Sequence, residues 1–594
     1  MREAFAAWEH GGIGAWERRG FGASGHPRSE LTLQQAQGKG HVGALGLRRK
    51  QPIISPKLPG SQVPRLPGSQ APTHPRTHAP PLDLPPGKCQ NSLKYPLSIR
   101  TGFASFAMTL TLYNSFSRRQ EPFTPLNPPH VGIYCCGVTV YDYCHLGHAR
   151  SYIVWDILRR YLEWRGYQVR YVQNFTDIDD KILNRAQEEG TSMDDVARRF
   201  TDAYFEDMER LNVRPADFYP RATHTLNGIQ RLIEELEAKG YAYKSGGDVY
   251  YEVRRFPEYG KLSGRNLEDL QAGASGRVAE GEQEAPKRDP FDFALWKRAK
   301  PEEPAWESPW GQGRPGWHIE CSAMVRENLG ETADIHCGGA DLMFPHHENE
   351  IAQSVAANGK PLAKYWLHNG MVTVNGEKMS KSLGNFTTIR DLLGQGIDPM
   401  AVRLFVMQAH YRKPLDFNDE AIASATNGWK RLQEALLFGS QYGEKLGWQQ
   451  TSATDSQNLD KDAVERFNQA MDDDLNTPSA LAVVFELVKI IRRDRNLLTH
   501  EGKTETPSDR LQQIWYTLVS LAQVLGLEAS APAETQPQGD TLSDEEVENL
   551  IQQRTAARKA KNFAEADRLR DQLQAAGITL IDKPGGITQW HRNS

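Results

Sequence analysis

The fold of this chain is decided by HVGIYCCGVTVYDYCHLGHARSYIVWDILRRYLEWRGYQVRYVQNFTDID, residues 130–179. Residues 130–142 have the apolar run and turn of a buried strand, and residues 168–179 indicate a second strand. Between them, residues 149–167 have the apolar spacing of a helix, and Gly166 is a natural end for it. The apolar side of this helix contains Val154, Ile157, Leu158, Tyr161 and Leu162. A strand, a helix and a strand predict a βαβ unit, and therefore a parallel sheet in an α/β core.

Length and composition exclude several classes of protein. At 594 residues the chain is too long for one core, so we expect three or four domains. The net charge of −5 means that a site for a polyanion must be a local patch. No apolar run is long enough to span a bilayer. Six cysteines in so long a chain do not make a disulfide framework, which favours a reducing compartment.

Residues 1–107 differ from the rest of the chain. The stretch SPKLPGSQVPRLPGSQAPTHPRTHAPPLDLPPG repeats PGSQ, is rich in proline and has no helical or strand period. Such a segment cannot bury enough apolar surface to offset its chain entropy. We expect a disordered or non-native extension, with the functional chain starting at Met108. The alternative is a targeting segment, because the stretch is basic.

The later patterns predict an insertion, a second α/β segment and a helical part. We expect a hairpin in GDVYYEVRRF (247–256), within an insertion that also holds helices and a polar stretch. The second α/β segment runs from GWHIECSAM (316–324) to KYWLHNGMVTV (364–374). In the helical part, Thr477 is the expected N-cap of an amphipathic helix whose first residue is Pro478. A capping box of Ser543 and Glu546 opens the last, basic module.

Two motifs indicate phosphate chemistry. HLGH, residues 145–148, lies where a strand and turn meet a helix, and the N-terminus of a helix suits an anion. The imidazoles of His145 and His148 are able to donate hydrogen bonds to a phosphate whose charge grows in a transition state. GEKMSKSLGN, residues 376–385, places Lys378 and Lys381 in a glycine-bounded loop, where they suit a departing pyrophosphate.

These motifs resemble those of the class I aminoacyl-tRNA synthetases. Four further stretches narrow the resemblance to the cysteinyl-tRNA synthetase family: YCCGVTVYDYCHLGHAR, NFTDIDDKI, PGWHIECSAM and DLMFPHHENEIAQS. The resemblance runs nearly continuously from about residue 108 to residue 594 and excludes the extension. Two residues depart from the usual pattern. Leu146 replaces a common Ile, and Cys337 stands where glycine is commoner, which raises the question of a backbone turn or redox sensitivity there.

The resemblance implies a Rossmann-like, parallel-sheet catalytic domain with an inserted connective domain, followed by a helical bundle and a small C-terminal anticodon-binding module. We expect the catalytic domain at 108–180 and 301–370, and the connective insertion at 181–300. The loop and stem-contact region is expected at 371–420. The tRNA-binding bundle and the anticodon module follow, at 421–530 and 541–594.

A metal site is the second expectation. His346 and Glu350 are four residues apart, which places both on one face of a helix. Spacing alone does not pair Cys136 with Cys321, but the family resemblance does, and it implies one zinc ion held by Cys136, Cys321, His346 and Glu350. A mixed set of sulfur, nitrogen and oxygen ligands suits zinc. The neighbours Cys135 and His347 are the alternatives.

The resemblance also implies the reaction and its partners. L-cysteine is activated by ATP, with Mg²⁺, to cysteinyl-adenylate, and tRNA-Cys then receives the cysteinyl group. His145, His148, Lys378 and Lys381 are the expected catalytic and ATP-binding residues. Thr176, Trp317 and His336 are expected around the amino acid. For tRNA contacts we expect Asp582 and an exposed Trp590, which suits base stacking. We expect a cytoplasmic monomer without a membrane partner.

Two other functions remain as alternatives. A cysteine-adenylating ligase that makes a small thiol without tRNA does not need the residues after 420. A non-catalytic zinc protein that binds nucleic acid leaves HLGH and KMSKS unexplained. Aminoacylation with and without tRNA, and ATP–pyrophosphate exchange, separate the three functions.

The extension provides the first prediction. A chain that starts at Met108 should fold and charge tRNA at the full rate, because the segment before it has no pattern of a packed structure. The measurement is the aminoacylation rate of the shortened chain beside that of the full chain. A substantial loss of charging would show that residues 1–107 contribute to function.

Overall fold

The computed structural model describes residues 109–269, 287–301, 303–380, 383–448, 458–529, 544–560, 562–576, 578–583 and 587–592. The expected extension at 1–107 lies outside these ranges.

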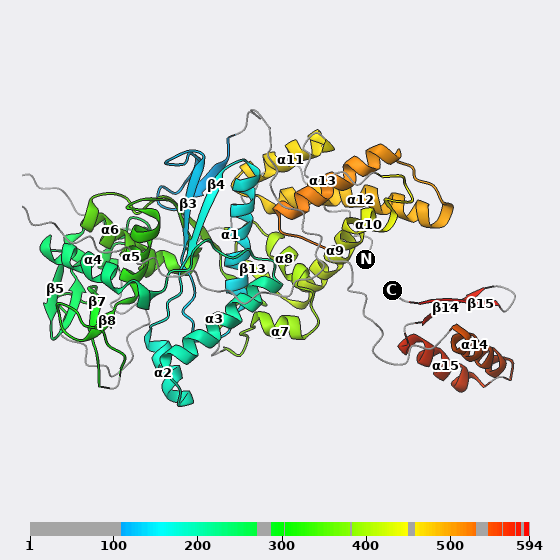
Figure 1. The fold of residues 1–594 in the computed structure, drawn as a ribbon, viewed down its shortest axis with the longest axis horizontal. Helices are drawn as coiled ribbons and strands as arrows, with labels where there is room; N and C mark the ends of the chain where they lie inside the picture. Colours follow the sequence, from blue (N-terminus) through cyan, green and yellow to red (C-terminus); the bar gives the residue numbers. More distant parts are fainter. Residues whose placement is uncertain are drawn as a thin grey trace, which may run out of the picture. The chain divides into compact units, whose positions relative to one another are not determined.

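A parallel four-stranded sheet forms the centre of the catalytic part, as the sequence predicted. Its order is β10 (Ala363–Asn369), β9 (Ala333–Gly339), β3 (His130–Cys135) and β4 (Gln168–Gln173). Helix α1 (Leu146–Trp164) connects β3 to β4, and Figure 1 shows it beside these two strands. The βαβ unit is therefore confirmed. Strand β3 ends in three buried residues, and β9 is buried up to Gly338, so the chain leaves β3 inside the protein.

Two more helices complete this α/β part. Helix α5 (Trp317–Leu329) precedes β9, and α6 (Glu348–Asn358) connects β9 to β10. The two helices pack against each other. A short hairpin of β1 (Thr111–Asn114) and β2 (Arg119–Pro122) opens the described chain.

The insertion contains three helices and an antiparallel sheet. The helices are α2 (Asp180–Glu189), α3 (Met193–Arg210) and α4 (Leu226–Ala238). The sheet has the order β5 (Ala242–Ser245), β6 (Asp248–Tyr251), β7 (Phe293–Arg298) and β8 (Gly313–Pro315), so it continues beyond residue 300.

The position predicted for the hairpin, residues 247–256, is wrong. The real hairpin joins β5 to β6, and a short 3-10 turn at Val253–Arg255 follows it. Its turn is formed by Gly246 and Gly247, both with positive φ, at 59° and 96°. Two-residue hairpin turns favour glycine for this reason, so the turn lies at the start of the quoted stretch and not inside it.

A small sheet follows the central one. Strand β11 (Val372–Val374) pairs antiparallel with β12 (Glu377–Lys378) and parallel with β13 (Leu415–Phe417). Helices α7 (Ile389–Gly394) and α8 (Pro399–Met407) lie between β12 and β13 in the chain.

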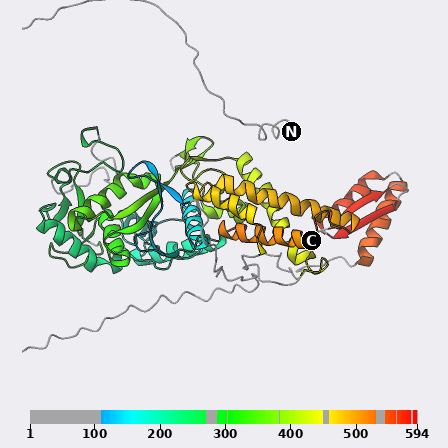
Figure 2. The same cartoon turned by 90° about the horizontal axis from the view of Figure 1, so that it is seen from above.

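The next part is a helical bundle of α9 (Asp419–Leu436), α10 (Phe438–Tyr442), α11 (Lys461–Asp472), α12 (Thr477–Glu501) and α13 (Ser508–Val524). Figure 2 shows its long helices side by side, in yellow and orange. The N-cap of α12 is Asn476, whose side-chain oxygen accepts the Ser479 N–H at 3.2 Å. The expectation that Thr477 is the cap is therefore wrong by one residue. Thr477 is already helical, and its hydroxyl donates to the Met407 carbonyl at 3.1 Å.

The last module has its own small core. Helices α14 (Asp544–Lys559) and α15 (Phe563–Ala575) precede the hairpin of β14 (Ile578–Lys583) and β15 (Ile587–Arg592). Val547, Leu573 and Ile578 form the buried core of the module. Ser543 of the expected capping box lies outside the described residues. No helix in the described ranges is both long enough and apolar enough to cross a membrane.

A buried carboxylate connects α1 to the helices that follow. Asp156 lies 2.8 Å from the Arg160 guanidinium and also contacts Arg403 of α8. Arg403 in turn donates to the Leu525 carbonyl at the end of α13, at 2.7 Å. Burial raises the pKa of Asp156, but the two guanidinium groups outweigh it and hold that pKa below its ordinary value. The charged form of Asp156 is therefore the native form at neutral pH.

Asp156→Asn should lower the free energy of unfolding by about 3–5 kcal/mol, because it removes a buried partner of two charged groups. Because the native pKa is depressed, the contribution of Asp156 is full above the ordinary carboxyl pKa and disappears as the pH falls through the native value. Chemical denaturation at several pH values measures both effects.

The matched control is Glu486→Gln. Glu486 pairs with Arg466 at 2.6 Å on the surface, where such a pair contributes less than about 1 kcal/mol. Equal losses in the two variants would contradict a special role for Asp156.

Candidate functional site

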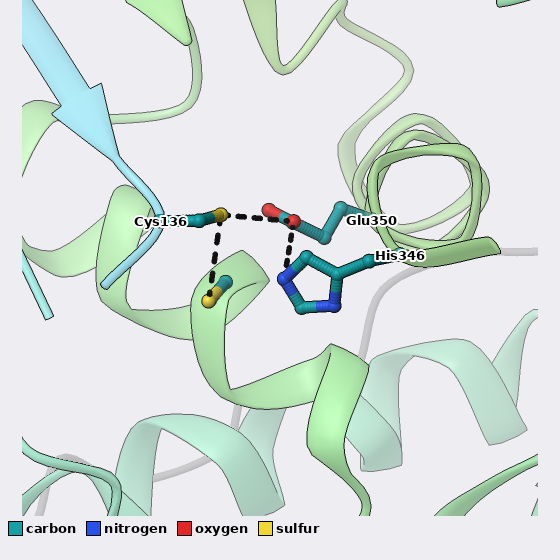
Figure 3. A group of neighbouring side chains, drawn as sticks. Cys136, His346 and Glu350 are labelled. Atoms are coloured by element: carbon teal, nitrogen blue, oxygen red, sulfur yellow. Dashed lines mark hydrogen bonds and ion pairs between the residues drawn. The ribbon is translucent and has the colours of Figure 1, made fainter. Parts of the chain in front are cut away.

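Four side chains meet beyond the carboxyl ends of β3 and β9. Cys136 directly follows β3, and Cys321 lies in the first turns of α5. His346 lies in a π-helical turn, Met343–His347, that leads directly into α6, and Glu350 lies in the first turn of α6. Figure 3 shows Cys136, His346 and Glu350 pointing toward one another. Their ligand atoms all lie within 4.8 Å of one another, and all four residues are buried. The structure thus brings together the set that the resemblance implied.

The distances within this group are short. The sulfur of Cys136 lies 4.0 Å from that of Cys321 and 3.6 Å from Oε1 of Glu350. Nε2 of His346 lies 2.9 Å from the same carboxylate oxygen. The other ring nitrogen, Nδ1, contacts Nδ1 of His318 at 2.9 Å, which orients the ring toward the group.

The protonation chemistry of the group fits a cation. Burial raises the pKa of Cys136 and of Glu350 well above their ordinary values. The hydrogen bond from Cys136 lowers the pKa of Cys321 to about 7. Oε2 of Glu350 is buried without a hydrogen-bond partner among the described residues. A carboxylate and two thiols so close together cannot all ionise unless a positive charge compensates them, and zinc accepts this donor set.

Two other histidines touch the same group. Nε2 of His336 lies 3.4 Å and Nε2 of His347 lies 3.3 Å from the sulfur of Cys136, so Cys136, His336, His347 and Glu350 form a second possible ligand set. Nδ1 of His347 contacts His368 at 2.8 Å. Burial lowers the pKa of His336 and of His347 well below the ordinary value, so both rings are neutral. Geometry alone leaves both sets open, with Cys136 and Glu350 common to them.

Cys135 is not part of either set. Its backbone lies opposite Cys337 in the register of β3 and β9, and both side chains are fully buried. Cys337 lies inside a regular strand, so no turn at this position requires a glycine. All five cysteines in the described ranges are free thiols.

The residues expected around the amino acid lie beside this group. The Trp317 ring stacks on His346, with centroids 4.2 Å apart. The His336 ring stacks on Trp366 at 4.5 Å. The Thr176 hydroxyl donates to the carboxylate of Glu320, the neighbour of Cys321, at 3.2 Å. Trp317 from α5 and His336 from β9 therefore contact the ligand group directly, whereas Thr176, after β4, contacts the neighbouring Glu320.

The HLGH histidines cap the helix that follows them. Nδ1 of His145 accepts the His148 N–H, and Nδ1 of His148 accepts the His145 N–H, both at 3.3 Å. The rings stack with centroids 3.6 Å apart. A Cβ at Gly147 would lie 2.8 Å from the His145 ring, so only glycine allows this stacking. Burial, then the neighbouring His145, lowers the pKa of His148 well below its ordinary value. Because Nδ1 of this neutral ring accepts, its proton is on Nε2.

The described part of the KMSKS segment is joined to HLGH. Lys378 is exposed at the end of β12. The Asn385 side chain bridges the loop, accepting from Ser380 N–H at 2.8 Å and donating to the Lys378 carbonyl at 3.2 Å. After the loop, the Leu146 N–H donates to the Thr387 carbonyl at 3.1 Å, beside HLGH. Lys381 lies outside the described residues. The role of Asn385 was missed, although its place at the end of GEKMSKSLGN was a signal for it.

The comparisons with known proteins agree with one family. Residues 122–427 match the model "tRNA synthetases class I (C) catalytic domain". Residues 466–529 match the DALR domain, and residues 542–590 match the "Cysteinyl-tRNA ligase anticodon binding domain". The cysteine–tRNA ligase of Gloeothece citriformis (strain PCC 7424) is 68% identical over 487 residues, which cover 82% of this chain and 100% of that protein. That of Trichodesmium erythraeum (strain IMS101) is 66% identical over 489 residues, with the same coverage.

This chain belongs to the cysteine–tRNA ligase family. Among solved structures, Mycobacterium tuberculosis methionyl-tRNA synthetase in complex with methionyl-adenylate is similar, with 18% identity and a TM-score of 0.45. That similarity covers 67% of this chain and 89% of the other. The family match confirms the class I fold that the sequence predicted.

The anticodon-binding module of this family member differs from the expectation at one residue. Trp590 is half-buried and packs against the core of Val547, Leu573 and Ile578, so the expected exposed ring is wrong. A module this small has little apolar surface to bury, and part of the indole contributes to its core. Asp582 lies in β14, opposite Thr588 of β15.

Cys136→Ala should remove tightly bound zinc, because both possible ligand sets contain this thiol. The zinc content of the purified variant, measured after dialysis against a chelator, checks this outcome. The control is Cys144→Ala, since Cys144 is an equally buried free thiol that belongs to neither ligand set. A variant Cys136→Ala that retains a full equivalent of zinc would exclude the site.

Proposed function

We propose that this chain is a cysteine–tRNA ligase, which activates L-cysteine with Mg-ATP and transfers it to the 3′ end of tRNA-Cys. The observation that carries the proposal is the match along the chain to relatives of this activity, at 68% and 66% identity over their full length. The match of residues 542–590 to a cysteinyl-tRNA ligase anticodon binding domain favours this function over a ligase that makes a small thiol without tRNA.

In the first step, a carboxylate oxygen of cysteine attacks the α-phosphorus of ATP, and the bond to pyrophosphate breaks. His145 and His148 stabilise the negative charge that grows on the α-phosphate, beside the N-terminus of α1. Lys378 and Lys381 hold the β- and γ-phosphates as they depart. The side chains form no covalent bond to the substrate, so positioning and charge account for the rate.

Selection of cysteine is the second task. Discrimination against serine on the order of 10⁴–10⁵ is more than pocket shape usually supplies. In this proposal Cys136, Cys321, His346 and Glu350 hold zinc, because Cys321 has the lowered pKa that suits a thiolate ligand. The bound ion supplies a strong preference for thiolate sulfur over hydroxyl oxygen. Thr176, Trp317 and His336 then enclose the rest of the amino acid.

In the second step, the terminal ribose hydroxyl of tRNA attacks the cysteinyl carbonyl, and AMP leaves. The DALR and anticodon-binding modules hold the tRNA, with Asp582 as an acceptor for a base edge. Because Trp590 packs against the core of the module, only the exposed part of its ring is available for stacking on a base. The enzyme acts as a monomer in the cytoplasm, where its thiols stay reduced.

The test of thiol selection uses protein with cobalt in place of zinc. Adding L-cysteine should strengthen the sulfur-to-metal charge-transfer band, whereas L-serine should leave it unchanged. A purely structural ion has four protein ligands and does not respond to the substrate. Absorption titration with each amino acid measures the difference. In parallel, cysteine-dependent ATP–pyrophosphate exchange tests the first step of the reaction.

A spectrum that does not respond to cysteine would make the metal structural, even if exchange occurs. Absence of exchange in the zinc-loaded full chain would exclude the ligase function itself. The Cys144→Ala variant provides the control, because this thiol lies outside both ligand sets.

A further inference from the structure

A buried arginine lies two residues beyond HLGH. Arg150, in the second turn of α1, has no exposed surface. Within the described ranges no carboxylate lies at ion-pair distance from it, unlike Arg160 on the same helix, which pairs with Asp156 at 2.8 Å. Burial lowers the pKa of Arg150 to about 10, so the group is still charged at neutral pH.

The guanidinium of Arg150 donates to three backbone carbonyls. One terminal nitrogen, Nη1, donates to Met371 at 2.7 Å. The other, Nη2, donates to Tyr411 at 3.0 Å and also to Lys413. Its Nε has no partner among the described residues. Thus one planar group on α1 fixes two chain segments.

Both segments enter the small sheet that carries the KMSKS lysine. Met371 immediately precedes β11, and β11 pairs with β12, which contains Lys378. Tyr411 and Lys413 precede β13, which runs parallel to β11 with Val372 opposite Leu415. The three carbonyls therefore lie at the start of two adjacent strands, and α1 carries the phosphate-binding histidines at its own start.

Further hydrogen bonds next to Arg150 join the same two segments to each other and to α1. The Ser151 hydroxyl donates to the Asn369 side chain at 2.8 Å. The Gly370 N–H donates to the Tyr411 carbonyl at 2.8 Å. A Cβ at Gly370 would lie 2.4 Å from the Lys413 carbonyl oxygen, so the two segments meet closely only because this residue is glycine.

The energetics indicate that Arg150 serves to position these segments and not to stabilise the fold. A buried charge without a counter-ion is costly, and apolar residues of similar volume often replace buried ions without loss of stability. What a guanidinium adds is a rigid planar set of donors that reaches several acceptors at fixed distances. Lysine, a point charge on a flexible stem, does not hold three carbonyls in one plane.

We propose that Arg150 is a positioning residue that sets the place of the KMSKS strand pair relative to the HLGH end of α1. It does not touch substrate. It acts in adenylate formation, the step that needs the histidines and the lysines on the same phosphates, and this role rests on the function proposed above. Transfer to tRNA, which starts from the finished adenylate, depends on it much less.

The experiment compares the two steps in Arg150→Lys. The rate of ATP–pyrophosphate exchange should fall about 10²-fold, as expected when a remote change displaces catalytic groups by about 1 Å. The KM for ATP should rise, while cysteine binding to the cobalt-loaded protein should be unchanged. Single-turnover transfer from isolated enzyme-bound cysteinyl-adenylate to tRNA should keep nearly its full rate.

The control is Arg160→Lys, a second buried arginine of α1 that donates to the backbone carbonyl of Asn212 at 2.9 Å. This variant should melt at a lower temperature but exchange pyrophosphate normally at 25 °C. If Arg150→Lys retains normal exchange, or loses exchange and transfer equally, the proposal is overturned. If the unaltered chain shows no exchange, the ligase function fails first.

A second variant approaches the same contact from its other side. Gly370→Ala pushes the Lys413 carbonyl away and should reproduce the selective loss of exchange while the Arg150 side chain is intact. Melting curves accompany both variants. If neither is folded at 25 °C, Arg150 serves stability and the positioning role is wrong.

Discussion

The parallel pairing of β3 with β9 is the constraint on which the site depends. In this register Cys135 lies opposite Cys337, which fixes where the chain leaves both strands. Cys136 then points into the ligand group, and a slip by one residue would turn it to the opposite face. The chain after β3 continues to HLGH, so one strand end leads to both the candidate metal ligands and the helix proposed to bind phosphate. The proposed sites of thiol selection and phosphate chemistry therefore both follow from one strand pairing.

Buried charges are treated in two different ways in this protein. Asp156 is surrounded by Arg160 and Arg403, and its pKa is depressed, as expected for an ion pair that serves structure. Glu350 has a raised pKa, and one of its oxygens has no hydrogen bond among the described residues. Both features are expected for a carboxylate that binds a cation. Buried ionisable groups with a strongly shifted pKa tend to lie at functional sites. The contrast distinguishes the structural carboxylate of Asp156 from Glu350, a candidate metal ligand.

Local patterns predicted the elements of the fold well and the details at their ends less well. The βαβ unit followed from the apolar spacing in residues 130–179, and the parallel sheet confirmed it. The cap of α12 was placed at Thr477, because the pattern did not show that Asn476 offers its oxygen to the third helical N–H. For the candidate site, helical spacing joined His346 with Glu350, but only resemblance joined Cys136 with Cys321. Their approach depends on tertiary packing of α5 against the sheet, which sequence spacing does not encode. The second histidine pair, His336 and His347, was not predicted as a ligand set: His347 was named only as an alternative to His346, and His336 only as a residue around the amino acid, because their approach to Cys136 also depends on tertiary packing.

The mutual capping by His145 and His148 has a consequence for the enzyme at rest. The N-terminus of a helix that binds an anion usually has unsatisfied N–H groups. Without a ligand, such a helix end frays, or its N–H groups bind other anions or water. Here the two imidazoles already occupy two of these N–H groups. The first turn of α1 is thus ordered before any nucleotide arrives, and the proton of His148 is already on the nitrogen that faces away from the backbone. In the proposed function, the nucleotide therefore meets a preassembled surface, and little of its binding energy is spent on ordering the protein.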